Sequence, residues 1–235
     1  MLVLIGNYTG DRLNFELARD LASAEGRETR MVLVADDVAS APASRAPDRR
    51  GVAGIFFAYK CAGAAAAAGA SLDEVAEVAR RTCDATRTAG VGLSPTVLPT
   101  TGRPTFTLAD DEMEIGIGIH GEPGVRRGRL ETADAIADTL TGTAAEELGL
   151  AVGSRVALLV NGLGATSAEE LYVLTSRVHD QLGKAGVRVH RSFVGEFATS
   201  MEMAGASVSL LRLDDELAGL VDAPAYSPFV PGGAR

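Results

Sequence analysis

The chain has 235 residues, of which 46% are hydrophobic, and a formal net charge of −9 at pH 7. Such a chain can form one large α/β unit or two small domains, and its acidic charge argues against nucleic acid or an anionic membrane as a partner. No apolar run approaches the length of a membrane span, and Cys61 and Cys83 are too few for a disulfide framework. We therefore expect a cytoplasmic protein with two free thiols.

The sequence alternates strand and helix signals from its first residues. Residues 2–5 are apolar and predict a buried strand at the very start of the chain. In chain order, the elements expected after it are a helix through Leu13, Leu17 and Leu21, a strand over 31–35, helices over 54–69 and 71–88, extended segments over 91–99 and 104–108, a strand over 113–120, a helix over 132–148, a strand over 156–160, a helix over 167–186, strands over 187–194 and 207–213, and a helix over 214–221. Capping boxes that begin at Ser71 and Ser167 support two of these helix starts.

The order of these elements favours an α/β fold with mixed or parallel sheets. We place a domain boundary near Gly90, where a predicted helix ends and extended sequence begins. Residues 1–90 would then form a first domain, and residues 91–235 a second. Because the chain opens directly on a buried strand, we expect the first domain to lack its N-terminal strands.

Large side chains recur at every second position from Met113 to Ile119, and the opposite face carries Gly116 and Gly118. This pattern predicts a strand with one bare face, where glycines indicate that another group approaches the backbone closely. The strand would deliver His120 at its C-terminal end, directly before a Gly-Glu-Pro-Gly turn. His120 is therefore a candidate reactive group at the mouth of a cleft, although a histidine in such a place is often only structural.

A second candidate is Asp11, in the turn-rich loop between the first strand and the first helix. Ligands of parallel α/β sheets bind at the carboxyl ends of the strands, which makes this loop a candidate cleft edge. An aspartate at a helix start also commonly caps exposed N–H groups. The pattern alone leaves both interpretations of Asp11 open.

Several common catalytic motifs are absent from the sequence. No Gly-x-x-x-x-Gly-Lys-Ser/Thr phosphate loop occurs, and no serine stands in a nucleophile elbow. The Asn-Gly-Leu-Gly segment at 161–164 lacks the full dinucleotide-binding pattern, so a glycine turn is the better interpretation. The spacing of histidines and cysteines would not build a metal site, and we expect none. We expect His179 at the surface and His190 in a structural role.

Five segments carry a resemblance to a known family. They are Asn-Tyr-Thr-Gly-Asp at 7–11, the alanine-rich helix with Lys60, Met-Glu-Ile-Gly-Ile-Gly-Ile-His-Gly-Glu-Pro-Gly at 113–124, Asn-Gly-Leu-Gly-Ala-Thr at 161–166, and the stretch over 200–217. In this order they resemble the K subunit of dihydroxyacetone kinase (glycerone kinase) over essentially the whole chain.

The resemblance implies roles for both candidate residues. The histidine that matches His120 attaches through a ring nitrogen to the carbonyl carbon of dihydroxyacetone, or of a similar short-chain ketose, as a hemiaminal. The aspartate that matches Asp11 binds a substrate hydroxyl and assists its deprotonation. The resemblance also implies a homodimer that acts in glycerol metabolism with a partner L subunit. That partner holds ATP or ADP with Mg²⁺, so this chain would bind no cofactor itself.

Two features depart from the family pattern. The family's Gly-Gly-Gly-Ser-Gly-His-Glu-Pro motif, whose histidine serves as the catalytic base, is absent from these 235 residues, and Gly6 stands where the family commonly has lysine. The loss of a positioned base typically removes ~10²–10⁴ in rate. The alternatives to an active kinase subunit are therefore a non-catalytic ketose-binding or co-regulatory homologue and an inactive truncated fragment.

Overall fold

The computed structural model describes residues 1–227 and 230. Its elements alternate largely as the sequence predicts. In chain order they are β1 (Leu2–Gly6), α1 (Thr9–Ala24), β2 (Arg30–Val34), the 3-10 helix η1 (Ala43–Asp48), α2 (Ile55–Ala67), α3 (Leu72–Asp84), β3 (Thr86–Gly92), β4 (Val97–Leu98), β5 (Arg103–Pro104), β6 (Glu112–Ile115), β7 (Arg126–Arg129), α4 (Ala133–Glu147), β8 (Arg155–Gly162), α5 (Ala168–Lys184), β9 (Arg188–Gly195), β10 (Gly205–Arg212) and α6 (Asp215–Asp222).

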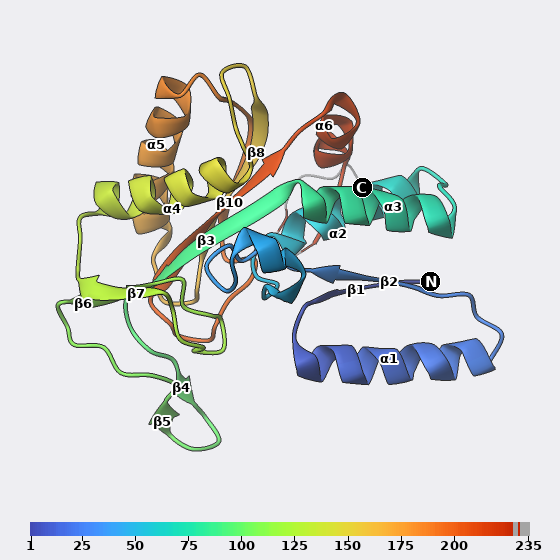
Figure 1. The fold of residues 1–235 in the computed structure, drawn as a ribbon, viewed down its shortest axis with the longest axis horizontal. Helices are drawn as coiled ribbons and strands as arrows, with labels where there is room; N and C mark the ends of the chain where they lie inside the picture. Colours follow the sequence, from blue (N-terminus) through green and yellow to red (C-terminus); the bar gives the residue numbers. More distant parts are fainter. Residues whose placement is uncertain (228–229, 231–235) are drawn as a thin grey trace.

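The strands form a large sheet, a parallel pair and a short hairpin. The large sheet has the order β7-β6-β3-β10-β8-β9, and its neighbours are antiparallel except for β8 and β9, which are parallel. β1 and β2 form the parallel pair, with Leu2 opposite Arg30 and Gly6 opposite Val34. β4 and β5 form a hairpin that projects from the body (Figure 1). The expected α/β fold with mixed and parallel sheets is confirmed.

The central strands of the large sheet are buried on both faces, and their successive side chains point into two different core clusters. On β8, Leu158 belongs to the core cluster formed with α4 and α5, whereas Leu159 belongs to the cluster formed with α2, α3 and α6. The β1–β2 pair lies beyond α2 and α3, and α1 lies outside that pair (Figure 1). The elements therefore stack in successive layers, in the order α4 and α5, the large sheet, α2 and α3, the β1–β2 pair, and α1 (Figure 1).

The helix expected over residues 71–88 is shorter than predicted. Its capping box at Ser71 is present, but α3 ends at Asp84 and the following residues form β3. β3 pairs with β10 along its whole length. Thr86 and Thr88 are buried, and β-branched side chains suit a pleated strand. Sheet pairing therefore prevails over the helical pattern in this segment.

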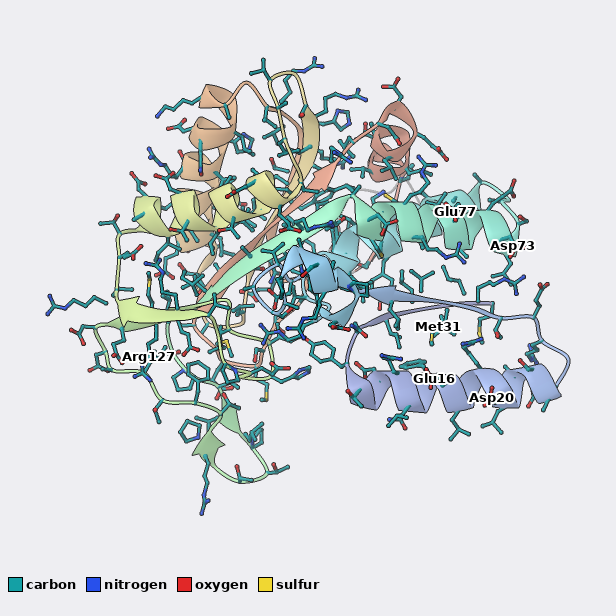
Figure 2. The ribbon with its side chains drawn as sticks, viewed as in Figure 1. Glu16, Asp20, Met31, Asp73, Glu77 and Arg127 are labelled. Atoms are coloured by element: carbon teal, nitrogen blue, oxygen red, sulfur yellow. The ribbon has the colours of Figure 1, made fainter. Side chains whose placement is uncertain are left out.

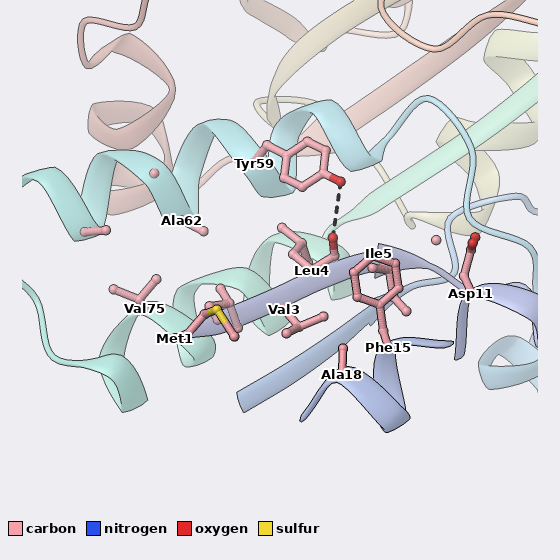
Figure 3. Close-up of a pocket in the computed structure, with 14 residues that line it drawn as sticks. Met1, Val3, Leu4, Ile5, Asp11, Phe15, Ala18, Tyr59, Ala62 and Val75 are labelled. Carbon is pink, nitrogen blue, oxygen red and sulfur yellow. Dashed lines mark hydrogen bonds between the residues drawn. The ribbon is translucent and has the colours of Figure 1, made fainter. Parts of the chain in front are cut away.

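An apolar groove lies along β1. A cavity of about 720 Å³ is lined by residues of β1, α1, α2 and α3 (Figure 3). Phe15 and Ala18 line it from α1, and the Tyr59 hydroxyl donates to the Leu4 carbonyl at 3.2 Å. Figure 2 shows Met31 of β2 on the side of the strand pair that faces α1. No residue of α1 is buried, so this helix covers β1 and β2 without a tightly packed interface.

The predicted boundary near Gly90 falls inside β3, and the division into residues 1–90 and 91–235 stays a prediction. Cys61 and Cys83 are free thiols, as expected. Within the described residues, no helix combines the length and the apolar character needed to cross a membrane.

Candidate functional site

His120 lies in a turn rather than at the end of a strand. β6 ends at Ile115, and Gly116 has a φ of +79°, a backbone conformation that glycine adopts without steric cost. A Cβ on Gly116 would also lie 2.5 Å from the Cβ of Ala39. The prediction of one continuous strand from Met113 to His120 is therefore wrong in its second half, because the chain leaves the sheet at Gly116.

The expected close approach to the glycine face is confirmed, and the approaching groups come from this chain. A Cβ on Gly118 would overlap the Glu122 carboxylate and would lie 2.5 Å from Nη1 of Arg50. The N–H of Gly118 donates to the Glu122 carbonyl at 3.0 Å and closes the turn. Charged side chains therefore occupy the bare side of this stretch.

Glu122 holds the His120 imidazole. Nδ1 of His120 lies 3.2 Å from Oε1 of Glu122, and the backbone N–H of His120 donates to Oε2 at 3.0 Å. An ionised carboxylate can only accept, so this contact places the ring proton on Nδ1 and leaves the Nε2 lone pair free. The His120 side chain is 61% exposed, which leaves the ring accessible to a small molecule.

The contact shifts the titration of both partners. The hydrogen bond to Glu122 raises the pKa of His120 above its ordinary value; burial opposes this rise, and the charge of Asp11 adds to it. Burial alone would raise the pKa of Glu122, but hydrogen bonds from the His120 ring and from the backbone lower it to about 2. Glu122 is thus ionised at neutral pH, and His120 holds its second proton to a higher pH than an isolated histidine.

Tyr8 and Asp11 bring the start of α1 to the His120 turn. The Tyr8 ring meets the imidazole edge to face, with the ring centroids 4.6 Å apart. Asp11 is exposed in the first turn of α1, at the rim of the apolar groove (Figure 3). The N-cap residue is Tyr8, which makes no side-chain cap bond, so capping does not explain Asp11. A Cβ on Gly6 would lie 3.2 Å from the Tyr8 ring. Because Gly6 has no side chain where the family commonly has lysine, the Tyr8 ring has room to lie here.

Arg50 ties the His120 turn to the segment after β2. Its guanidinium pairs with Asp37 at 2.8 Å and donates to the Gly116 carbonyl at 2.7 Å. Burial raises the pKa of Asp37 to about 6, although the positive charge of Arg50 opposes the shift. This bridge joins two segments that are 66 positions apart in the sequence.

Sequence reasoning missed three residues of this site. Glu122 carried a usable signal, since a carboxylate two residues after a histidine in a glycine turn can reach back to the ring. Tyr8 and Arg50 carried none, because their contacts with the His120 turn depend on how distant segments pack. The two predicted site residues, His120 and Asp11, do lie in one region, joined by Tyr8.

The other histidines and the buried lysine have structural partners. Nε2 of His179 lies 2.9 Å from the Ser192 hydroxyl. Nε2 of His190 lies 2.7 Å from Oδ2 of Asp222, which links β9 to α6. Lys60 is buried and donates to a backbone carbonyl of the segment after α6. None of these contacts reaches the His120 turn.

The turn at 161–164 also serves the fold. Gly164 has a φ of +126°, and a Cβ there would overlap the Met201 carbonyl. The Asn161 side chain accepts the N–H groups of Phe197 and Ala198 at 2.8 and 2.9 Å, which supports the interpretation as a glycine turn. In the part of the chain that the structure describes, no group of three or more His, Cys, Asp or Glu side chains is arranged to hold a metal ion.

Comparison with known proteins adds to this geometry. Residues 1–229 match the family model described as the Dak1 domain. The chain is 43% identical over 228 residues to the dihydroxyacetone-binding subunit of PTS-dependent dihydroxyacetone kinase 2 from Listeria innocua. That alignment covers 97% of this chain and 68% of the relative.

Two solved structures share the fold. The dihydroxyacetone kinase operon co-activator superposes with a TM-score of 0.88 at 33% identity, over 95% of this chain and 70% of that chain. The dihydroxyacetone kinase from C. freundii, in complex with AMP-PNP and Mg²⁺, superposes with a TM-score of 0.82 at 29% identity. That superposition covers 93% of this chain and 40% of the kinase, so the chain spans less than half of that protein. The chain belongs to the Dak1 family, as its sequence motifs indicate.

Proposed function

We propose that this chain is the dihydroxyacetone-binding part of a dihydroxyacetone kinase and that it captures its substrate covalently on His120. The observation that carries the proposal is the contact between Nδ1 of His120 and Glu122, because it leaves Nε2 unprotonated on an exposed ring. The relationship to the Listeria dihydroxyacetone-binding subunit supports the choice of substrate.

The capture step is a nucleophilic addition. The Nε2 lone pair of His120 attacks the carbonyl carbon, and the electron pair of the C=O bond moves to oxygen. As positive charge develops on the ring, the Nδ1 proton passes the Glu122 carboxylate to water, and the alkoxide oxygen takes up one proton from water. In net, one proton moves from Nδ1 to the substrate oxygen. A neutral hemiaminal therefore forms without a further reactant. Glycerol has no carbonyl group to attack, so the adduct selects ketoses over polyols.

Asp11 has the second role in this proposal. Its carboxylate binds a hydroxyl of the captured ketose, orients it and assists its deprotonation for attack on a phosphoryl group. The phosphoryl group comes from a partner L subunit that carries ATP or ADP with Mg²⁺, and the AMP-PNP and Mg²⁺ in the C. freundii kinase support a nucleotide on the partner. We further propose that the chain acts as a homodimer in the cytoplasm, in glycerol metabolism.

A second candidate function is ketose binding without phosphoryl transfer. The superposition with a dihydroxyacetone kinase operon co-activator favours it. In this case His120 would capture the ketose as above, and the adduct would act as a signal for a regulatory partner. The two functions share the capture step and differ in turnover.

Native mass spectrometry of the full chain with dihydroxyacetone tests the capture step. The wild-type chain should gain the mass of one dihydroxyacetone molecule, and His120→Ala should lose this gain. His179→Ala is the matched control, because His179 is also exposed but lies on α5 against Ser192. An adduct that persists in His120→Ala would rule out the assigned role. With an L subunit, nucleotide and Mg²⁺ added, turnover supports the kinase, and an adduct without turnover supports the binding protein.

The pH dependence of adduct formation tests the role of Glu122. The neutral ring is the nucleophile, so the yield should rise with pH around a midpoint above the ordinary histidine pKa of about 6.5. Glu122→Gln removes the ionised acceptor, so the midpoint should move down toward that ordinary value. The yield at high pH should also fall, because the ring is less well oriented. Glu131→Gln is the control, and equal midpoints in all three proteins would contradict the role of Glu122.

A further inference from the structure

The β4–β5 hairpin projects from the body as an exposed arm (Figure 1). We use "the arm" for residues 97–104, all of which are exposed. Two of its apolar side chains, Val97 and Leu98, are 40% and 39% exposed. A two-stranded hairpin is at best marginally stable by itself, so the arm depends on the way its base is held.

The base of the arm is fixed to the turn after β9. Glu202 accepts the N–H of Val97 at 2.6 Å and the hydroxyl of Thr96 at 3.0 Å. Thr105, on the other side of the base, donates its N–H to the Thr96 carbonyl at 2.9 Å. Pro99 and Pro104 restrict the backbone within the arm. The base of the arm is therefore fixed by contacts within this chain.

The base of the arm is also in contact with the His120 turn. Gly121 has a φ of +83°, and a Cβ there would lie 2.5 Å from the Cβ of Thr105. On the other side, the hydroxyl of Ser200 donates to the Ile119 carbonyl. The His120 turn, the base of the arm and the segment over 200–202 thus form one connected unit. A displacement of the base of the arm would therefore move the turn that carries the His120 imidazole.

Phosphoryl transfer requires that the protein carrying the donor approach the His120 turn. The reacting atoms must come within roughly 3–3.5 Å of each other, so the protein that holds the donor must cover the exposed His120 ring. A standard interface buries about 800 Å² per partner, which is a patch of roughly 16 Å radius. Four residues of extended chain, at ~3.3 Å each, reach roughly 13 Å. Because the base of the arm contacts the His120 turn and the arm is shorter than this radius, the arm lies within the footprint of a donor protein that covers His120.

We propose that the arm is a docking element for the protein that presents the phosphoryl donor to the ketose held on His120. Val97 and Leu98 supply the apolar contacts of this interface, and the base of the arm positions them relative to the imidazole. The inference rests on the proposed function, since it assumes a separate donor protein. A second copy of this chain is the competing occupant, and the experiment below distinguishes the two.

The test compares V97S/L98S with Val152→Ser in the full chain. Val152 is an exposed apolar residue between α4 and β8, so it controls for a general loss of apolar surface. The probe is an L subunit loaded with ADP and Mg²⁺, titrated calorimetrically. V97S/L98S should weaken its binding at least tenfold, and Val152→Ser should leave it unchanged. Glu202→Gln, which loosens the base and leaves the arm sequence intact, should weaken binding by a smaller factor.

Two further measurements separate the possible failures. Adduct formation with dihydroxyacetone should be the same in V97S/L98S as in the wild type, which also shows that the variant is folded. Absence of an adduct in the wild type would overturn the proposed function itself. A normal adduct with unchanged binding of the L subunit in V97S/L98S would overturn only the role of the arm. Light scattering that shows a wild-type dimer and a V97S/L98S monomer would assign the arm to a second copy and overturn the proposal.

Discussion

The large sheet and the β1–β2 pair differ in how an amphipathic helix packs against them. On the large sheet, the apolar stripe of α5 packs into the core, and Leu174 and Val178 are buried. On the β1–β2 pair, α1 carries a leucine stripe of similar spacing, yet Leu13, Leu17 and Leu21 are each about 60% exposed. An amphipathic pattern therefore predicts a helix, but burial requires a second layer that covers the stripe.

The two proposed site residues come from these two differently packed layers. The His120 turn follows β6 of the large sheet, whose central strands are buried on both faces. Asp11 and Tyr8 come from the start of α1, in the loosely packed layer. The proposed nucleophile thus lies in a turn that follows the well-packed sheet, and its proposed helper lies on the helix that packs loosely and should open at a lower free energy.

The largest effect is expected for a truncation in the large sheet. Leu158 on β8 is fully buried in the cluster formed with α4 and α5. Leu158→Ala should lower the free energy of unfolding by about 2–5 kcal/mol, because it removes buried methyl groups and leaves a cavity. Urea denaturation followed by circular dichroism measures the change. Val152→Ala, at an exposed position, is the control. Equal losses of stability in both variants would contradict the claim that the large sheet is the tightly packed layer.

An intermediate effect is expected for the bridge between the layers. Arg50→Met would leave Asp37 buried without its ion pair and would free the Gly116 carbonyl. Loss of one partner from a largely buried pair costs about 3 kcal/mol. The same denaturation measurement gives the stability, and adduct yield reports whether the His120 turn has moved. Arg45→Met is the control, since Arg45 is exposed on the same connecting segment. A loss no larger than that of the control would mean that the bridge does not join the layers.

Local sequence patterns predicted the elements that their own residues determine. The capping boxes at Ser71 and Ser167 form as expected, because each needs only residues within one turn. The close approach at Gly116 and Gly118 was also predictable, since two glycines on one face of a strand indicate that a neighbouring group lies against the backbone. The strand over residues 86–92 was not, because its threonines form a strand only when β10 lies beside them.

In the candidate site, too, some residues were predictable from local motifs and others were not. His120 and Asp11 stood in recognisable motifs, so the sequence alone was enough to select them. Tyr8 and Arg50 act through contacts with a segment far along the chain, and such contacts leave no local periodicity. The direction of the His120 ring depends on the turn that brings Glu122 back to it, which a strand ending at His120 would not form.

The smallest effect is expected on the outer face of α1, where a truncation tests directly whether this helix is loosely packed. Leu17 is 59% exposed, so Leu17→Ala should change the free energy of unfolding by no more than about 0.5 kcal/mol. Hydrogen exchange gives a second measure, because amides of α1 should exchange through local opening at a lower free energy than those of β8. Leu174→Ala on α5 is the matched control, and it should cost several times more. A loss above about 2 kcal/mol for Leu17→Ala would mean that another surface covers α1 in solution, since only a buried leucine costs that much.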